Sequence, residues 1–269
     1  SILDVWTDYN SPYYKGAENI KDPKYFSHFK KAVKGKTILH VSRRAKNVLI
    51  NLSNNLTIIV HMKMTGHLLY GDYNRSDPYN RFIHLIFYLS NGKNIELCDT
   101  RKFAKVAVTQ TATIHLSPHL KDIGPEPLEK DFTFSKFLQK ITLKIKNEIK
   151  PTLTDQFVIA GIGNIYADES LWRAGIHPEE LVGNIPKEKL KKLFTAIKKT
   201  LKKGIDFGGD SMSDYRNIHG ERGKFQEQHK AYQRKGERCQ KPGCKGFIVR
   251  TVVAGRGTHF CEVHQRLGK

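Results

Sequence analysis

The sequence CQKPGC at residues 239–244 and the sequence CEVH at residues 261–264 decide how the C-terminal end of the chain folds. Each supplies two metal-ligand side chains in a tight turn, and sixteen residues separate the two pairs. Thiolate and imidazole groups suit Zn²⁺, which binds four of them in a tetrahedron. The predicted ligands are Cys239, Cys244, Cys261 and His264. Because the protein fills all four positions, we predict a structural zinc site.

The residues around these ligands are predicted to form a zinc finger over 229–269. This stretch has too little apolar content to fold without a cross-link or a bound metal ion. Between the ligand pairs, residues 247–253 and 255–258 are typical of a β-hairpin. Arg256 lies between two glycines at its tip. An exposed arginine on a rigid finger is well placed to bind a phosphate.

Residues 37–108 are predicted to form a β-sandwich or barrel. Short runs of mostly alternating polar and apolar residues are separated by turn signals such as Ser90-Asn91-Gly92. Cys98 ends one of these runs and is expected to be a buried small side chain. The predicted strands are 38–41, 48–52, 56–61, 82–89 and 95–97.

Beyond the sequence GPEPL at 124–128, the pattern becomes helical. Apolar residues recur at helical spacing over 135–149 and 186–203. Residues 204–223 are polar and rich in glycine, which predicts a long loop, and loops of this length are typical of functional lids or of disordered segments. We therefore expect an α+β multidomain protein. Its predicted parts are a β-sandwich at 1–123, a linker at 124–134, a helical domain at 135–228 that contains loop 204–225, and the zinc finger at 229–269.

The charge of the chain indicates a polyanionic partner. Lys and Arg total 46 against 26 acidic residues, which gives a net charge of +20. Nucleic acid is the leading candidate and an acidic membrane surface the alternative. No apolar run approaches the roughly 18 residues of a spanning helix, and no signal peptide is recognisable. The sequence therefore predicts an intracellular protein that does not enter a membrane.

The sequence AGIGNIYADE at 160–169 predicts a tight turn into a helix. Two glycines let the backbone approach a ligand closely, and the amides at the helix start, together with Asn164, can hold a phosphate. Taken alone, this pattern is equally typical of an ordinary corner between two helices.

Several motifs together resemble the Fpg/Nei family of DNA glycosylases, and in particular its formamidopyrimidine branch. They occur in the family's order and cover essentially the whole chain. The resemblance implies a fold with an N-terminal β-sandwich, a helix-two-turns-helix domain and a zinc finger. The motifs are HMKMTG at 61–66, DTRKF at 99–103, GPEPL at 124–128, GIGNIYA at 161–167, AGIHP at 174–178 and the terminal finger.

The resemblance also implies roles for single residues. Met64, Arg101 and Phe103 match a triad that fills the gap left by an extruded base, with Arg101 facing the orphaned cytosine. Residues 211–225 match a loop that closes over 8-oxoguanine. The matching residues of this loop include Ser211, Met212 and Tyr215. The residues that match phosphate-gripping groups are Lys46, His61, Asn164, Tyr232 and Arg256, and Lys150 matches a lysine near the active site.

The activity implied is that of a bifunctional glycosylase and AP lyase. Such an enzyme flips 8-oxoguanine or a formamidopyrimidine out of duplex DNA, excises it, and cleaves the abasic site by β,δ-elimination. We expect the partner to be damaged double-stranded DNA, the protein to be a monomer, and its place to be the bacterial cytoplasm, in association with the nucleoid.

The nucleophile is the main departure from the family pattern. Members begin with Pro-Glu, whose proline amine attacks the sugar, whereas this sequence begins at Ser1 and aligns with the strand that follows that helix. The expected nucleophile is therefore a proline upstream of Ser1, the α-amine of Ser1, whose ordinary pKa is about 7.7–8.0, or Lys46. Lys46 would need burial and the neighbouring Arg43 and Arg44 to depress its pKa.

Two other functions stay open at this point. A chain with no nucleophile would bind lesions or abasic sites without cutting them. An RNA-binding or ribosomal zinc-finger protein would explain the charge, but not Met64, Arg101 and Phe103 in their motifs. The finger also departs from the family, since four residues lie inside its first cysteine pair and His264 stands where a cysteine is usual.

Overall fold

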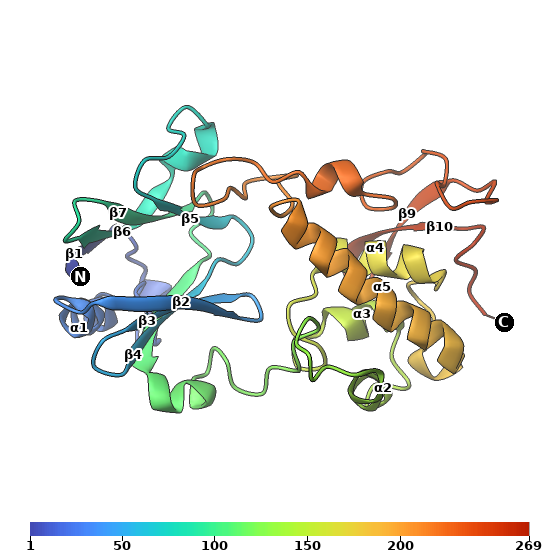
Figure 1. Ribbon diagram of the computed structural model, residues 1–269, viewed down its shortest axis with the longest axis horizontal. Coiled ribbons are helices and arrows are strands. Elements are labelled where there is room, and N and C mark those ends of the chain that lie inside the picture. The colour runs from blue at the N-terminus through green and yellow to red at the C-terminus, as the bar shows by residue number, and fades with distance from the viewer. Residues whose placement is uncertain (269) are drawn as a thin grey trace. The chain divides into compact units, whose positions relative to one another are not determined.

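Two separate stretches of the chain build each of the two units of this protein. The computed structural model describes residues 1–268. Its first unit contains residues 1–121 and 208–224, and its second contains residues 122–207 and the chain from 225 onward (Figure 1). The two units are described one at a time below.

The first unit contains two four-stranded antiparallel sheets, which confirms the predicted β-sandwich. The five predicted strands are all present, and three strands that the pattern did not predict complete the sheets. One sheet contains, in spatial order, β1 (Ile2–Thr7), β6 (Ile83–Leu89), β7 (Asn94–Asp99) and β5 (Gly66–Tyr70). The other contains β2 (Ile38–Arg44), β3 (Asn47–Leu52), β4 (Leu56–His61) and β8 (Lys105–Gln110).

A helix that the sequence analysis missed, α1 (Pro23–Val33), packs against this core. Asp22 caps it by accepting a hydrogen bond from the Lys24 amide at 3.0 Å, and Pro23 occupies the first turn. Phe29 and Val33 are fully buried, and the Phe29 ring lies 6.2 Å from that of Phe87. Short 3-10 helices complete the unit at η1 (Pro12–Tyr14), η2 (Pro78–Arg81) and η3 (Thr111–Leu116).

The second unit is helical, with a two-stranded hairpin. The predicted helix over 135–149 is shorter than expected, since α2 ends at Thr142 and turns follow it. The chain is extended at Glu148, where it forms a β-bridge with Leu181, and α3 begins at Ile149. The predicted helix over 186–203 is α5 (Lys187–Asp206), whose apolar stripe is buried at Leu190, Leu193 and Ile197. The remaining elements are α2 (Phe134–Thr142), α3 (Ile149–Thr154), α4 (Asn164–Ala174), η4 (Val182–Asn184), η5 (Phe225–Gln228), β9 (Ile248–Val253) and β10 (Arg256–Cys261).

The hairpin of β9 and β10 confirms the predicted finger. Its strands pair from Arg256 opposite Val253 to Cys261 opposite Ile248. The turn between them uses Ala254 and Gly255, both with positive φ. A small cluster of its own joins Trp172 of α4 to Ile248 and Cys261. None of the helices within residues 1–268 has the length and apolar character needed to cross a bilayer.

The predicted loop over 204–225 is shorter than expected, because residues 204–206 belong to α5 and Phe225 begins η5. Residues 208–224 group with the sandwich, whereas the sequence analysis assigned them to the helical domain. The reason is local hydrogen bonding: the Tyr70 amide donates to the Ile218 carbonyl and the Asn74 amide to the His219 carbonyl, each at 3.0 Å. Because a loop that bonds to a sheet edge is held by that sheet, this segment belongs to the first unit.

We predict that replacing Leu193 with alanine destabilises the helical unit by about 2–5 kcal/mol, because it removes a fully buried side chain and leaves a cavity. Urea unfolding followed by circular dichroism measures this change. Leu143, which is 72% exposed, provides the matched control, and its alanine variant should shift stability by less than about 0.5 kcal/mol. Equal losses in the two variants would contradict the assigned core.

Candidate nucleic-acid interface

The carboxylate of Asp99, at the end of β7, joins three segments of the first unit. It is fully buried and accepts hydrogen bonds from the Tyr9 hydroxyl at 3.1 Å, the Ala104 amide at 2.6 Å and the Thr65 hydroxyl. The Thr65 hydroxyl also accepts a hydrogen bond from the Arg101 amide at 3.3 Å. Asp99 therefore fixes the turn before β5 to the turn after β7.

These two turns present the three residues predicted to replace an extruded base. The guanidinium of Arg101 lies 4.4 Å from the centre of the Phe103 ring, and its Nη1 lies 3.8 Å from the sulfur of Met64. Met64 is 68% exposed and Phe103 is 41% exposed. Large apolar side chains held in the open by a rigid support are suited to enter an apolar space in a partner. The structure thus brings the predicted triad together.

Lys21 supports the second turn from the inside, a role that the sequence analysis missed. Its side chain is buried, and its ammonium donates to the Lys102 carbonyl and lies 4.6 Å from the centre of the Tyr14 ring. Burial lowers the pKa of Lys21. Since Lys102 has a positive φ, the chain reverses sharply here and aims Arg101 and Phe103 outward.

His61 and Lys46 lie near this surface at the ends of β4 and of the β2–β3 hairpin. Burial, reinforced by Lys63 and Lys46, lowers the pKa of His61 to about 4. Its Nδ1 accepts a hydrogen bond from the Lys63 amide at 3.0 Å. His61 is therefore neutral at pH 7 and offers its Nε2–H as a donor. Lys46 is exposed, so the burial that its role as a nucleophile required is not present.

In the second unit, the start of α4 is bound to the hairpin. The Asn164 side-chain amide donates to the Gly257 carbonyl at 3.0 Å. The ammonium of Lys150, whose side chain is only 1% exposed, reaches the same carbonyl at 3.2 Å and the Thr258 hydroxyl at 2.6 Å. The side chains of Asn164 and Lys150 thus both bind the Gly257 carbonyl. These hydrogen bonds fix the start of β10, the strand that begins at Arg256.

Two buried carboxylates of α4 complete this support. Asp168 lies 2.6 Å from the Lys150 ammonium and accepts from the His259 amide at 2.9 Å. Burial lowers the pKa of Lys150, and Asp168 opposes that shift. Glu169 accepts from three successive backbone amides, of which that of Tyr232 lies at 2.9 Å. Neither acid has a role that its local sequence pattern predicts.

The resulting surface is hollowed and basic. Asn164 and Tyr232 line a cavity of about 410 Å³ together with cationic side chains such as Lys235 and Arg250. Its lining residues are Asn164, Tyr232, Gln233, Lys235, Arg250, Gly257 and His259. Amide, phenol and guanidinium donors around one hollow are the groups that bind phosphate oxygens. Arg256 lines a neighbouring pocket with Lys150 and Ala254.

The four predicted metal ligands converge in the finger. Their ligand atoms all lie within 4.8 Å of one another, with Cys239 Sγ 3.4 Å from His264 Nδ1 and Cys244 Sγ 3.6 Å from Cys261 Sγ. Tetrahedral Zn²⁺ with Zn–S bonds of about 2.3 Å places its sulfur ligands about 3.8 Å apart. The spacing therefore fits that ion.

The surroundings of the ligands support the same assignment. His264 Nε2 lies 3.0 Å from the Trp172 carbonyl, so donating its proton there leaves Nδ1 free to bind a metal. The Trp172 indole donates to Cys239 Sγ at 3.3 Å, and the Gly246 amide donates to Cys244 Sγ at 3.4 Å. Such donors stabilise thiolates, the form in which cysteine binds zinc.

The predicted loop residues have different environments. Ser211 is fully buried, and its hydroxyl donates to the Tyr215 carbonyl at 2.7 Å and accepts from the Gly223 amide at 2.8 Å. The side chain of Tyr215 is half-buried, and burial raises the pKa of its phenol. Met212 is 43% exposed. Ser211 therefore shapes the loop, whereas Met212 is accessible to a ligand.

An apolar cavity of about 740 Å³ lies in the first unit. Side chains from both sheets line it, including Val41, Ile50, Leu68 and Ile95, and so do Ser1 and residues 215–218 of the loop. A cavity this large between two sheets leaves apolar surface without packing partners, which favours an apolar occupant.

Two family models match the chain. The formamidopyrimidine-DNA glycosylase N-terminal domain matches residues 15–106, and the formamidopyrimidine-DNA glycosylase H2TH domain matches residues 123–216. A formamidopyrimidine-DNA glycosylase from Pelotomaculum thermopropionicum is 39% identical over 248 residues, which are 92% of this chain and 88% of that protein.

Solved structures agree with these matches. The complex of Lactococcus lactis Fpg with abasic-site DNA is similar with a TM-score of 0.84 and 32% identity, covering 98% of this chain and 92% of that one. The complex of the same protein with Fapy-dG-containing DNA is similar with a TM-score of 0.83 and 32% identity, covering 99% and 92%.

We predict that Asp99→Asn destabilises the first unit by about 1.5–3 kcal/mol, because the amide cannot accept all three buried hydrogen bonds that the carboxylate accepts. Chemical denaturation measures the change. Asp131→Asn, at a carboxylate that is 76% exposed, provides the control and should alter stability by less than about 0.5 kcal/mol. Similar values for the two variants would show that Asp99 does not hold the turns together.

Proposed function

Since this chain belongs to the formamidopyrimidine-DNA glycosylase family, we propose that it excises 8-oxoguanine and formamidopyrimidines from duplex DNA and cleaves the resulting abasic site by β,δ-elimination. The observation that carries the proposal is the exposed cluster of Met64, Arg101 and Phe103. The chain is a DNA glycosylase and AP lyase of oxidised-purine repair, and the non-catalytic alternative is not favoured.

The cluster matches the physical needs of base extrusion. Turning a base out of a duplex costs a few kcal/mol of stacking and pairing, and a wedge of side chains that fills the gap offsets part of that cost. Met64 and Phe103 supply apolar surface, while Arg101 supplies hydrogen-bond donors for the base left without a partner. Stacking on Phe103 holds the guanidinium in place before DNA binds.

The DNA backbone is held by groups of both units. In this proposal Asn164, Tyr232 and Arg256 bind phosphates with the helical unit, and His61 and Lys46 do so with the sandwich. Lys150 is too buried to contact DNA directly, so its role is to position Gly257 and Thr258 beneath Arg256. The net charge of +20 provides the long-range attraction.

The reaction requires an amine. Its nitrogen attacks the sugar C1′ and loses a proton, while the electrons of the glycosidic bond leave with the base, which takes up a proton. The C1′–O4′ bond then breaks as the C1′–N double bond of the imine forms, and O4′ takes up a proton.

Borohydride trapping tests the activity. Incubating the protein with a duplex that contains 8-oxoguanine and with borohydride should reduce the imine to a stable covalent adduct, and omitting borohydride should give a cleaved strand. Peptide mapping of the adduct identifies the residue that supplied the amine. The undamaged duplex is the control and should give no adduct.

Two outcomes would overturn the proposal. Binding of the lesion duplex with neither an adduct nor strand cleavage would make the protein a non-catalytic lesion binder. Equal affinity for RNA and for lesion-free duplex would favour the RNA-binding alternative, because a wedge that fills the gap of an extruded base gives no advantage on those ligands.

We propose that the finger holds one structural Zn²⁺ through Cys239, Cys244, Cys261 and His264. Bound there, the ion would fix the ends of β9 and β10 and leave no position for a catalytic water. The Trp172 contacts to Cys239 and His264 would then tie the metal site to α4, which also carries Asn164.

Metal removal should therefore unfold the finger and weaken DNA binding, because zinc binding supplies folding free energy here. A colorimetric zinc assay together with circular dichroism of the chelated protein checks this. His264→Cys should retain zinc, since four thiolates also form a tetrahedral site, whereas His264→Ala should lose it. A chelated protein with unchanged hairpin structure and affinity would contradict the structural role.

The relatives of this chain named above are bacterial proteins, which supports a proposal for its cellular location. We propose that it acts as a monomer on damaged double-stranded DNA in the bacterial cytoplasm, in association with the nucleoid.

A further inference from the structure

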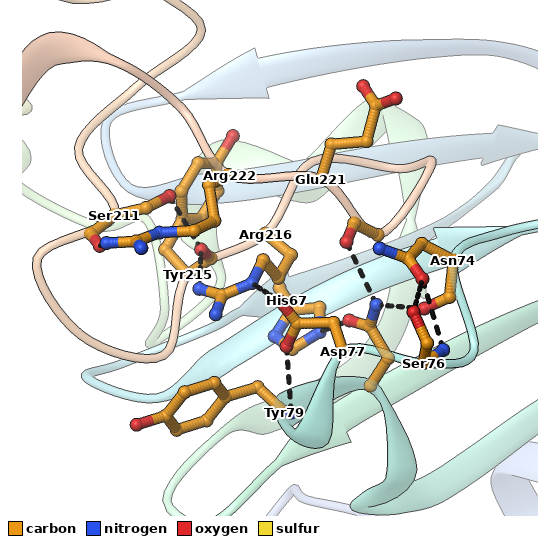
Figure 2. Close-up of polar contacts among 12 residues, drawn as sticks. His67, Asn74, Ser76, Asp77, Tyr79, Ser211, Tyr215, Arg216, Glu221 and Arg222 are labelled. Carbon is orange, nitrogen blue, oxygen red and sulfur yellow. Dashed lines mark hydrogen bonds and ion pairs between the residues drawn. The ribbon is translucent and has the colours of Figure 1, made fainter.

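A buried ion pair anchors the segment 208–224 to the sandwich (Figure 2). Arg216 Nε lies 2.7 Å from Asp77 Oδ2, and the two side chains are only 4% and 13% exposed. Asp77 also caps η2 by accepting from the Tyr79 amide at 2.9 Å, and the Arg216 guanidinium lies 4.7 Å from the centre of the Tyr79 ring. A charge pair this well covered is lost at a high cost if either partner is removed.

Arg216 shapes the segment as well as anchoring it. Its Nη1 donates to the Ser213 carbonyl at 3.0 Å and to the Tyr215 carbonyl at 2.8 Å. The Ser211 hydroxyl accepts from the Gly223 amide at 2.8 Å, so the two ends of the segment lie together. The chain around Met212 is thus folded over a buried arginine whose position Asp77 determines.

The far side of the segment is held by Asn80, which is 2% exposed. Its amide donates to the Gly220 carbonyl at 3.0 Å and to the Asn74 carbonyl at 2.6 Å, while its oxygen faces His67 Nε2 at 3.0 Å. Gly220 has a φ of +74°, and a Cβ there would collide with the Asn80 amide nitrogen. Position 220 therefore has no room for a side chain larger than that of glycine.

The segment also touches the turn that carries the wedge. The Thr100 hydroxyl donates to the carboxylate of Asp214, and Thr100 directly precedes Arg101. The residues that would fill the gap in the DNA and the segment that would cover the extruded base therefore belong to one bonded structure within the first unit.

We propose that Asp77 and Arg216 are positioning residues that hold the segment 208–224 in the shape that covers an extruded oxidised purine. The inference rests on the proposed function for the identity of that base. Holding the segment in place beforehand avoids the conformational entropy of ordering it when the base arrives. The pair then contributes to removal of the base but not to cleavage at a site from which the base is already gone.

The test compares Asp77→Asn and Arg216→Met with wild type on two substrates. Single-turnover excision from an 8-oxoguanine duplex should fall about tenfold in each variant, while strand cleavage at a preformed abasic site should stay within about twofold. The asparagine side chain of the Asp77→Asn variant can still cap η2, so the fold of that turn is kept. The double variant should be no worse than Arg216→Met alone, because that substitution already removes the ion pair with Asp77 along with the hydrogen bonds to the Ser213 and Tyr215 carbonyls.

Hydrogen exchange provides a readout that is independent of activity. The amides of residues 215–223 should exchange at least about tenfold faster in both variants than in wild type. Glu221→Gln is the matched control: it lies in the same segment, exposed, 3.2 Å from the Asn217 amide, and should change neither exchange nor excision.

Each outcome decides between the two claims. Unchanged exchange in both variants, or equal losses on the two substrates, would overturn the positioning role. A wild-type protein that does not excise 8-oxoguanine would overturn the proposed substrate, while the exchange comparison would still decide whether Asp77 and Arg216 hold the segment.

Discussion

A buried carboxylate at residue 99 is the constraint on which the DNA-directed surface of the first unit depends. Asp99 accepts hydrogen bonds from segments that are distant in sequence, namely Tyr9, Thr65 and Ala104. A carboxylate removed from water is stable only when donors surround it, so these turns must come together for the unit to fold. Met64 and Phe103 are exposed as a consequence, because the polar atoms of their turns are already engaged inside.

In the helical unit, too, buried carboxylates hold separate segments together. Asp168 and Glu169, successive residues of α4, bind different parts of the second unit. Asp168 binds Lys150 of α3 and the β10 backbone, and Glu169 binds the backbone amides that end at Tyr232. Interior charges thus orient the backbone, while the phenol of Tyr232 and the guanidinium groups of Arg250 and Arg256 line the hollows at the surface. In each unit the rigidity of the binding face derives from the charges beneath it.

The sequence predicted features that local pattern determines. Strand alternation predicted β3 and β4, ligand spacing predicted the four metal ligands, and motif resemblance predicted the triad. The helix α1 was missed although Asp22 and Pro23 are a recognisable start signal and Phe26, Phe29 and Val33 recur at helical spacing. The roles of Asp99, Lys21 and the Asp77–Arg216 pair were inaccessible, since each depends on contacts between residues far apart in the chain, 139 residues apart for the last.

The decisive measurement is the structure of the protein bound to a duplex that contains a stable abasic-site analogue opposite cytosine. The expected result is that Met64 and Phe103 lie within the base stack at the vacated position and that the Arg101 guanidinium donates to the orphaned cytosine. A complex in which these three side chains lie outside the stack, with the Asp99 hydrogen bonds intact, would contradict it.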